Sequence, residues 1–337
     1  MKKYKNAVVI MRAQPLHNAH LELISKASEQ AENIVILIGS SKQPRTVKNP
    51  FTFDERKDMI LAAINIDSDV NIFIKPLVDI PYNDQTWAAQ VQDVVKSCVE
   101  SGSICLVGHD KGQDTKYLHI FPQWSFEEFE NVQNQLNATD IRELYFKQLY
   151  NADYIKGVIP VSTLEFLEAF RDTDEYENLI EEKEFIAKYK QQFASLAYPP
   201  FFVTVDTLIV QSGHALLIKR RHNPGKNLWA IPGGFIGQNE LIIDAAIREL
   251  KEETKIKVPV AVLKGSIKKT QVFDHPNRSA RGRTITHCFY IELPDGPLEK
   301  VKAADDAQAV KWVPIAEIAS DKCFEDHFSM IQMMIGA

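Results

Sequence analysis

Hydrophobic and polar residues alternate along the first half of the chain in a way that predicts strands and helices in turn. Apolar runs such as "AVVIM" from Ala7 and "NIVILIG" from Asn33 are followed by stretches with the spacing of amphipathic helices, which begin at Leu21, Thr52 and Thr86. Two more apolar runs read "VNIFIKPL" and "SICLVGHD". Strands that alternate with helices are typical of βαβ units, so we predict an α/β doubly wound domain with a parallel sheet.

The pattern changes in the second half. An acidic amphipathic helix is expected over residues 175–195, and Pro199 and Pro200 end it before a new strand. A hairpin is predicted at "VTVDTLIVQSGHALLIKRR" and a helix over residues 241–254. Further strands are expected at "VAVLKG", "THCFYIEL" and "AVKWVPI". We therefore predict a first domain over residues 1–172, a helical linker over 173–198 and an α+β domain over 199–337.

Composition excludes several classes of function. Of the 337 residues 45% are hydrophobic and 25% charged, as in globular proteins, and no run approaches the roughly 20 apolar residues of a membrane-spanning helix. The N-terminus has no signal-peptide pattern, and the four cysteines lack metal-binding spacing, so a cytoplasmic protein with reduced thiols is expected. A net charge of -6 gives no nucleic-acid footprint. A homo-oligomer is left open.

Two histidines, His17 and His20, follow the first predicted strand directly. In a doubly wound sheet the first strand-to-helix turn is the favoured phosphate site, because the helix N-terminus offers unpaired N–H groups and a partial positive charge. Imidazoles placed there can donate hydrogen bonds to a polyphosphate whose charge grows in the transition state. A helix-capping histidine pair and a zinc site are the alternatives.

The stretch "QLNATDIREL" carries a second candidate anion site. Asn137 is expected to cap a helix whose first turn contains Thr139 and Arg142, so that a hydroxyl, main-chain N–H groups and a guanidinium converge on one anion. Taken alone, this stretch is equally an ordinary capped surface helix. Together with the histidine turn, it predicts the other half of a triphosphate clamp.

These two stretches resemble known signatures. "RAQPLHNAH" resembles the HxGH motif of nucleotidyltransferases and "LNATDIR" resembles their ISxTxIR motif, in the order seen in archaeal-type nicotinamide mononucleotide adenylyltransferases. The resemblance implies a Rossmann-like fold, transfer of an adenylyl group from ATP to nicotinamide mononucleotide, and Mg2+ on the leaving pyrophosphate. The departures are Ala13 for Phe, Ala19 for Gly and Asn137 for Ser, and Ala19 lacks the conformational freedom of glycine.

The resemblance also implies roles for individual residues. Asn83 and Trp87 are expected to meet the mononucleotide, Trp87 by stacking on the pyridine ring, although Trp87 is alternatively a core aromatic. Gly108 and Asp110 are expected in the adenosine pocket, with a plain loop as the alternative. The catalytic residues implied are His17, His20 and Arg142, within an ATP-binding set of Arg12, Gln14, His17, His20, Gly108, Asp110, Asn137, Thr139 and Arg142.

Three carboxylates in the second half are placed for metal binding. Glu249, Glu252 and Glu253 are spaced i, i+3 and i+4, so they share one face of a helix and repel one another. A hard divalent cation relieves that repulsion, and oxygen ligands favour Mg2+ or Mn2+, which lower the pKa of an attacking water. A solvated acidic face is the alternative, but the spacing Gly-x5-Glu-x7-Arg-Glu-x2-Glu-Glu, which starts at Gly234, favours the metal site.

This spacing resembles the Nudix box, with Lys255 where the box has glycine, and "TQVFDHPNRSARGRTITHCFYIEL" resembles a segment of ADP-ribose pyrophosphatases and their regulator relatives. The two halves together resemble bifunctional adenylyltransferase/Nudix enzymes, which implies hydrolysis of ADP-ribose to AMP and ribose 5-phosphate. Another nucleoside diphosphate derivative, or a non-catalytic ADP-ribose sensor, is the alternative. The resemblance implies metal ligation and catalysis by Glu249, Glu252 and Glu253, a metal contact from Gly234, and substrate contacts from Arg220, Gly233, Gly234 and Arg248.

Overall fold

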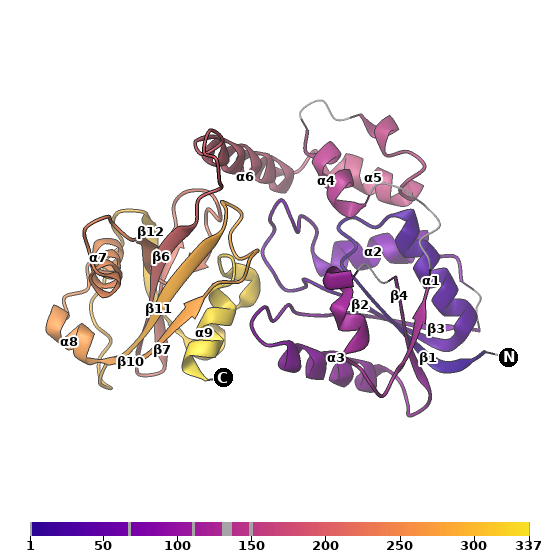
Figure 1. Cartoon of the computed structure of the whole chain (residues 1–337), viewed down its shortest axis with the longest axis horizontal. Helices are drawn as coiled ribbons and strands as arrows, with labels where there is room; N and C mark the ends of the chain where they lie inside the picture. Colours follow the sequence, from indigo (N-terminus) through magenta and orange to yellow (C-terminus); the bar gives the residue numbers. More distant parts are fainter. Residues whose placement is uncertain (1, 67–68, 110–111, 130–136, 148–150, 337) are drawn as a thin grey trace. The chain divides into compact units, whose positions relative to one another are not determined.

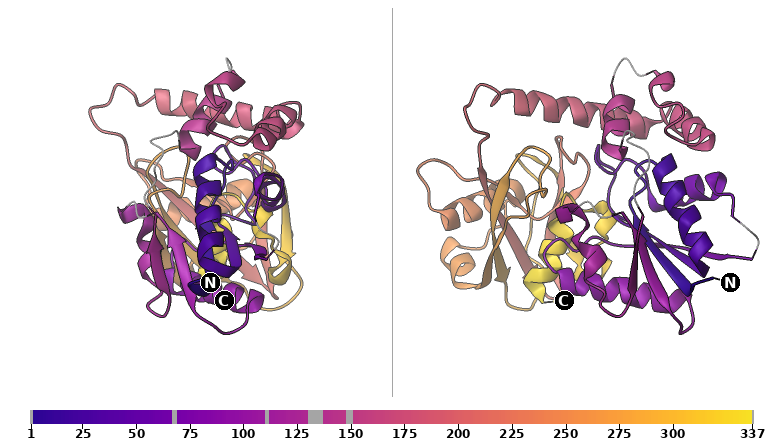
Figure 2. Two further views of the ribbon diagram at one scale, coloured as in Figure 1. Left: turned by 90° about the vertical axis from the view of Figure 1, so that its right-hand side faces the viewer. Right: turned by 45° about the vertical axis from the view of Figure 1, so that its right-hand side comes forward.

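The chain divides into two compact units, Met1–Ile180 and Glu181–Ala337 (Figure 1). The division falls inside helix α6 (Asp174–Gln191), which is one uninterrupted helix (Figure 2). No helix among the described residues has the length and apolar character that crossing a membrane requires. The computed structural model describes residues 2–66, 69–109, 112–129, 137–147 and 151–336.

Among the described residues of the first unit, five parallel strands form one sheet, in the order β3-β2-β1-β4-β5. Side chains of the central strand β1 alternate between two core clusters, because Ala7 and Val9 pack into one and Val8 into the other. Apolar cores therefore lie on both faces of the sheet, and the doubly wound prediction is confirmed. The strands are β1 (Tyr4–Met11), β2 (Ala31–Ile38), β3 (Asn71–Pro76), β4 (Ile104–Gly108) and β5 (Ser125–Glu128).

The helices of the first unit supply the other side of each core cluster. Ile24 of α1 and Ile60 of α2 pack on one face of the sheet, and Val91 of α3 packs on the other. The start of α2 is fixed by Thr52, whose hydroxyl accepts a hydrogen bond from the main-chain N–H of Glu55 at 3.3 Å. The helices are α1 (Asn18–Gln30), α2 (Phe53–Ala63), α3 (Asp84–Cys98), η1 (Gly112–His119), α4 (Ala138–Tyr145), η2 (Ala152–Tyr154) and α5 (Val161–Phe170).

A mixed sheet forms the core of the second unit, in the order β10-β11-β6-β7-β12, with β8 beside β7 and β9 beside β6. Strands β6 and β7 form the predicted hairpin, and β6 runs parallel to β11. Helices α7 and α9 lie on opposite sides of this sheet (Figure 1). The elements are β6 (Phe202–Gln211), β7 (His214–Arg220), β8 (Trp229–Ala230), β9 (Gly233–Phe235), α7 (Ile242–Thr254), α8 (Val260–Gly265), β10 (Ile267–Phe273), β11 (Thr284–Glu292), β12 (Ala307–Pro314), η3 (Ile315–Glu317), η4 (Ser320–Lys322) and α9 (His327–Ile335).

The strand predicted at "VAVLKG" is wrong, because this stretch is helix α8. Pro259 precedes it with φ -59°, a value already suited to a helix start. Only Leu263 is fully buried, while Val260 and Val262 are exposed. The two valines therefore do not pack against a sheet, and a short helix is enough to bury Leu263.

Candidate functional site

The first candidate site lies where β1 and β4 end. These strands are neighbours in the sheet, although β2 and β3 come between them in the chain. At such a switch point the loops leave the sheet in opposite directions, and the strand ends line a crevice that suits a ligand. The loop after Met11 leads to His17 and His20, and Gly108 ends β4 beside it.

The two histidines meet at the N-terminus of α1. His17 is the N-cap residue, and its main-chain N–H donates to Nδ1 of His20 at 3.3 Å. The two rings stack with centroids 3.7 Å apart. Because Nδ1 of His20 accepts this bond, its neutral ring carries a proton on Nε2 and presents a donor there. The capping pair considered as an alternative is therefore present, and it orients both rings at a helix terminus that attracts anions.

Helix α4 joins this turn through Arg142. The Asn137 side chain caps α4 as predicted, accepting from the main-chain N–H groups of Thr139 at 2.9 Å and Asp140 at 3.1 Å. Arg142 donates from Nη2 to the hydroxyl of Thr139 at 3.1 Å and from Nη1 to the carbonyl of Gln14 at 2.7 Å. The bond between Arg142 and Gln14, which are 128 positions apart in the sequence, brings the two predicted motifs together.

Positive charge is concentrated in this region. Burial, followed by the charge of Arg12, lowers the pKa of Arg142 to about 10, so the guanidinium stays charged at neutral pH. Burial and the charges of Arg12 and Arg142 also lower the pKa of Lys48, and Asp79 only partly opposes them. Lys48 is not among the predicted site residues, because it lies outside both motifs of the first site. An anion bound here would relieve the repulsion among three cations.

Arg12 and Gln14 take different positions around the turn. The side chain of Arg12 is exposed, and its carbonyl accepts a hydrogen bond from the buried Arg56 at 2.7 Å. The Gln14 side chain is buried and bonds to both main-chain groups of Phe51, at 2.8 and 3.0 Å. Gln14 therefore anchors the loop, and its side-chain amide is already committed to protein.

The two alanine departures have different backbone conformations. Ala19 lies in the first turn of α1 and is not in the left-handed region, so this position does not use the conformational freedom of glycine. Ala13 instead has φ 49°, which is costly for a residue with a β-carbon. The strain in the turn is therefore located at Ala13.

The residues expected to contact the mononucleotide both have structural partners. Asn83 caps α3, since its Oδ1 accepts the main-chain N–H of Thr86 at 3.0 Å. Trp87 is half-buried, with its ring centroid 5.9 Å from that of Tyr117 and 6.4 Å from that of Phe121. The capping hydrogen bond holds Asn83 and ring packing holds Trp87, so the core role considered for Trp87 is present in part.

Gly108 ends β4 in a close-packed position. A β-carbon there would lie 2.6 Å from Cδ2 of Leu118, so no larger residue fits without a shift. Its carbonyl accepts the main-chain N–H of Phe129 at 3.0 Å. Asp110, predicted beside it, lies outside the described residues.

The second candidate site is built on α7. Arg248 binds three carboxylates, Glu240 at 2.7 Å, Glu249 at 2.9 Å and Glu252 at 2.9 Å. These bonds, above all the one to Glu240, raise the pKa of Arg248 despite some burial. Arg248 was predicted to contact substrate, but its donors go to the carboxylates of the motif. Its observed contacts hold the acidic side chains in place.

Two of the predicted metal ligands are poorly solvated. Burial raises the pKa of Glu253 to about 9, although the N–H of Gly233 donates to its carboxylate at 3.0 Å. Burial also raises the pKa of Glu249. A β-carbon on Gly234 would lie 2.5 Å from Oε1 of Glu249, so glycine is what lets the main chain approach this carboxylate.

This donor set fits a hard divalent cation. It offers carboxylate oxygens and the main chain at Gly234, and a cation would compensate the burial of Glu249 and Glu253. In the part of the chain that the structure describes, no three acidic, histidine or cysteine side chains converge as a ready metal centre. Arg248 holds Glu249 and Glu252 in this arrangement.

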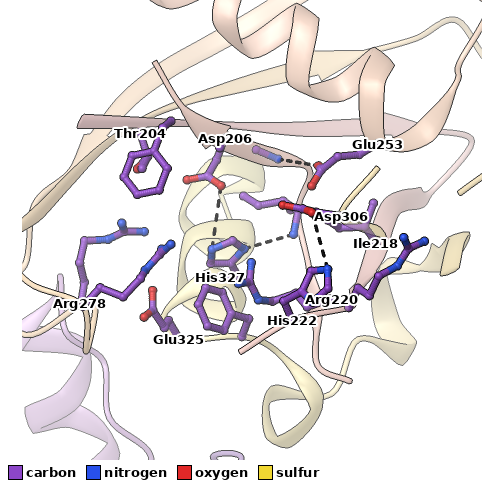
Figure 3. Close-up of a pocket in the computed structure, with 17 residues that line it drawn as sticks. Thr204, Asp206, Ile218, Arg220, His222, Glu253, Arg278, Asp306, Glu325 and His327 are labelled. Carbon is purple, nitrogen blue, oxygen red and sulfur yellow. Dashed lines mark hydrogen bonds and ion pairs between the residues drawn. The ribbon is translucent and has the colours of Figure 1, made fainter. Parts of the chain in front are cut away.

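A pocket adjoins these carboxylates (Figure 3). Four of its lining residues, Arg220, Gly233, Gly234 and Glu253, are predicted site residues. The pocket also contains five lining residues that the sequence analysis did not identify as site residues: Asp206, Arg278, Arg281, Glu325 and His327. Two of them, Arg278 and Arg281, lie in the stretch "TQVFDHPNRSARGRTITHCFYIEL".

A buried polar network closes the inner end of the pocket. Nδ1 of His327 accepts the main-chain N–H of Ile231 at 3.2 Å, and its Nε2 lies 3.9 Å from Asp206 (Figure 3). Thr286 donates its hydroxyl to the other oxygen of Asp206 at 2.5 Å. Burial lowers the pKa of His327. The ring is therefore neutral at pH 7, with its proton on Nε2 towards Asp206.

Comparison with known proteins matches each half of the chain to a different family. Residues 12–198 match the cytidylyltransferase-like family and residues 200–334 match the NUDIX domain. A nicotinamide/nicotinic acid mononucleotide adenylyltransferase of Acinetobacter baylyi is 36% identical over 196 residues, which are 58% of this chain and 98% of that protein. An ADP-ribose pyrophosphatase of Methanocaldococcus jannaschii is 35% identical over 130 residues, which are 39% of this chain and 70% of that protein.

The same similarity extends over the whole chain in one solved structure. It is a bifunctional NMN adenylyltransferase/ADP ribose pyrophosphatase from Francisella tularensis, complexed with AMP and a manganese ion. The TM-score is 0.89 at 35% sequence identity, and the match covers 99% of each chain.

Proposed function

The chain belongs to the cytidylyltransferase-like family in its first half and to the NUDIX family in its second, and from this premise we propose an enzyme of NAD metabolism with two activities. The first transfers an adenylyl group from ATP to nicotinamide mononucleotide and gives NAD and pyrophosphate. The second is the metal-dependent hydrolysis of ADP-ribose to AMP and ribose 5-phosphate. The observation that carries the proposal is the match over 99% of the chain to a structure named for both activities.

In the first reaction the 5'-phosphate of the mononucleotide attacks the α-phosphorus of ATP, and the bond to the leaving pyrophosphate breaks. Such a transfer needs positioning and charge neutralisation and no covalent nucleophile. His17 and His20 donate to the phosphates from the start of α1, while Arg142 and Lys48 supply positive charge from the side. A bound Mg2+ would neutralise the leaving pyrophosphate.

In the second reaction a water attacks one phosphorus of the diphosphate, the bridging P–O bond breaks, and the two monophosphates leave. Glu249, Glu252, Glu253 and the main chain at Gly234 would hold the divalent cation, for which we propose Mg2+ with Mn2+ as the alternative. Such a cation lowers the pKa of the attacking water. Arg248 keeps Glu249 and Glu252 on one side of α7.

One preparation tests both activities. ATP with nicotinamide mononucleotide should give NAD and pyrophosphate, and the nicotinic acid form, assayed in parallel, defines the preferred acceptor. ADP-ribose with Mg2+ should give AMP and ribose 5-phosphate, and a chelator should stop this hydrolysis. NAD synthesis in the chelated preparation should continue once Mg2+ is restored to that assay. Tight binding of ADP-ribose without products would contradict the hydrolase and support a sensor.

A further inference from the structure

Four consecutive residues near the C-terminus, Phe324–His327, lie beside the pocket of the second site, and three of them, Phe324, Glu325 and His327, line it. Figure 3 shows Glu325 and His327 among the lining side chains. We call the four residues the C-terminal segment. Each of the four contacts a residue that is distant in sequence. The segment therefore contacts strands β6 and β7 and the loop between β10 and β11. In chain order the contacts are with Arg220, Ala280, Arg278 and Asp206.

The contact between Asp326 and Arg278 is the most buried of these. The guanidinium donates from Nε to Oδ2 at 3.0 Å and from Nη2 to Oδ1 at 2.9 Å, and the side chains are 3% and 8% exposed. Burial opposes the charge of Arg278, but Asp326 and Asp206 raise its pKa overall. A bidentate ion pair of this kind fixes the relative position of its two side chains. Loss of one partner leaves the other as a buried charge without compensation.

Arg278 is therefore an anchor, because Nε and Nη2 of its guanidinium both bind Asp326. It lies in the loop between β10 and β11, where its main-chain N–H donates to His275 at 3.0 Å. Three residues further on, the same loop presents Arg281 to the pocket. The pair with Asp326 thus fixes the loop three residues before Arg281, and the N–H of Ala280 donates to Glu325 at 3.4 Å just before it.

Arg281 is placed for an anion. Among the described residues it forms no ion pair, and its guanidinium lies 5.3 Å from the ring centroid of Phe235. Phe235 directly follows Gly234, whose main chain approaches the carboxylate of Glu249. The guanidinium is thus held beside the strand that leads to the metal-binding carboxylates. Burial raises the pKa of Glu325 while the charge of Arg281 lowers it, and Nε of Arg281 donates to the hydroxyl of Ser279 at 3.5 Å. A planar fork with no carboxylate in direct contact suits a phosphate group.

We propose that Arg281 binds a phosphate of the diphosphate substrate and that Asp326 is a positioning residue, which places Arg281 through Arg278. This inference rests on the proposed hydrolase activity. It assigns the substrate-binding role in this loop to the arginine that is not ion-paired. The buried arginine three residues earlier only supports it.

Steady-state kinetics with ADP-ribose and saturating Mg2+ test the proposal in three variants: Arg281→Ala, Asp326→Asn and the double variant. Loss of a charged hydrogen bond to phosphate should raise KM by about 10- to 100-fold in Arg281→Ala, with kcat changed less than about threefold. Asp326→Asn should raise KM in the same way. Because Asp326 acts through Arg281, the double variant should be no worse than Arg281→Ala.

Arg283→Ala is the matched control, since Arg283 is an arginine of the same loop that pairs with Asp274 and is not among the residues lining the pocket. Its KM should stay at the wild-type value, and NAD synthesis should be unchanged in every variant. Multiplicative effects in the double variant, or a lower melting temperature of Asp326→Asn at unchanged KM, would overturn the proposal. If Asp326→Asn does not fold, an unchanged KM in Arg281→Ala still overturns it.

Calorimetric titration of ADP-ribose with a chelator present separates this proposal from the hydrolase activity. If wild-type protein binds ADP-ribose but never hydrolyses it, the proposed activity fails, while weaker binding by Arg281→Ala still supports the anion site. If wild-type protein hydrolyses ADP-ribose and Arg281→Ala behaves like wild type in both assays, only the inference fails.

Discussion

Lys255 shows how a single backbone conformation explains a motif position. It ends α7 with φ 50° and ψ 26°, in the left-handed region, and its main-chain N–H donates to the carbonyl of Lys251 at 3.0 Å. A β-carbon is disfavoured there, which is the physical reason that glycine is usual just after a helix. The cation at the negative end of the helix dipole compensates only in part.

Lys255→Gly should therefore raise the free energy of unfolding by about 0.5–1 kcal/mol, measured by urea denaturation. Hydrolysis of ADP-ribose should stay within a few-fold of wild type, because the carboxylates lie earlier in the helix. Lys257→Gly is the matched control: Lys257 is also exposed but is not in the left-handed region, so glycine should destabilise there. Equal effects of the two substitutions would contradict the argument.

The hydrogen-bond donors of the first site lead to a second prediction at this scale. His17→Ala, His20→Ala and Arg142→Ala should each lower NAD synthesis by about 10²-fold, since each removes a donor to the phosphates. ADP-ribose hydrolysis in the same preparations should not change. Lys147→Ala is the control, because Lys147 is an exposed cation just beyond α4. Rates close to wild type in all three variants would refute the phosphate clamp.

At the scale of the element, α7 carries a carboxylate whose protonation is linked to folding. The pKa of Glu253 is raised to about 9 from an ordinary 4.5, chiefly by burial, so the folded metal-free protein binds a proton that the unfolded chain releases above pH 4.5. The contribution of Glu253 to the free energy of unfolding should then be largest below pH 4.5 and fall as the pH rises towards 9. Glu325, with a pKa raised to about 7 by burial, acts in the same direction.

Melting temperatures with a chelator should thus decrease between pH 5.5 and 8.5, and Glu253→Gln should flatten the decrease without abolishing it. Added Mg2+ should raise the melting temperature more at pH 8.5 than at pH 5.5, because metal and proton compete for the same oxygens. The variant should lose this metal effect and fall to about 1% of wild-type hydrolysis or less, with NAD synthesis intact. A pH-independent metal effect in the wild type would contradict this account.

Elements with a local signal were predictable from the sequence. Strands β1 to β4 appear as apolar runs, and Thr52 and Asn137 mark helix starts by their side chains. Strand β5 reads SFEE, has no apolar run and is not predicted. The C-terminal segment gave no such signal, since Asp326 acts on Arg278, 48 residues away. Helix α8 was mistaken for a strand because short valine-rich runs suit either structure until their burial is known.

At the scale of the whole molecule, α6 contributes to the core of each unit by different residues. Tyr176 and Leu179 are buried in the first unit, and the hydroxyl of Tyr176 donates to the carbonyl of Tyr145 at 3.2 Å. In the second unit the buried Glu182 accepts the main-chain N–H of Gly225 at 2.9 Å. The region expected to be a linker over residues 173–198 thus supplies side chains that the units need for their own packing.

A fragment of residues 181–337 should therefore be more stable than one of residues 199–337, by about 1–3 kcal/mol, since the shorter fragment leaves the N–H of Gly225 without its acceptor. Urea denaturation of both fragments measures the difference. Glu182→Ala in the longer fragment should remove most of it. Glu181→Ala should not, because that side chain is 61% exposed and lies 3.8 Å from Lys226. Equal stability and equal ADP-ribose hydrolysis in the two fragments would mean that this half of α6 is only a connection.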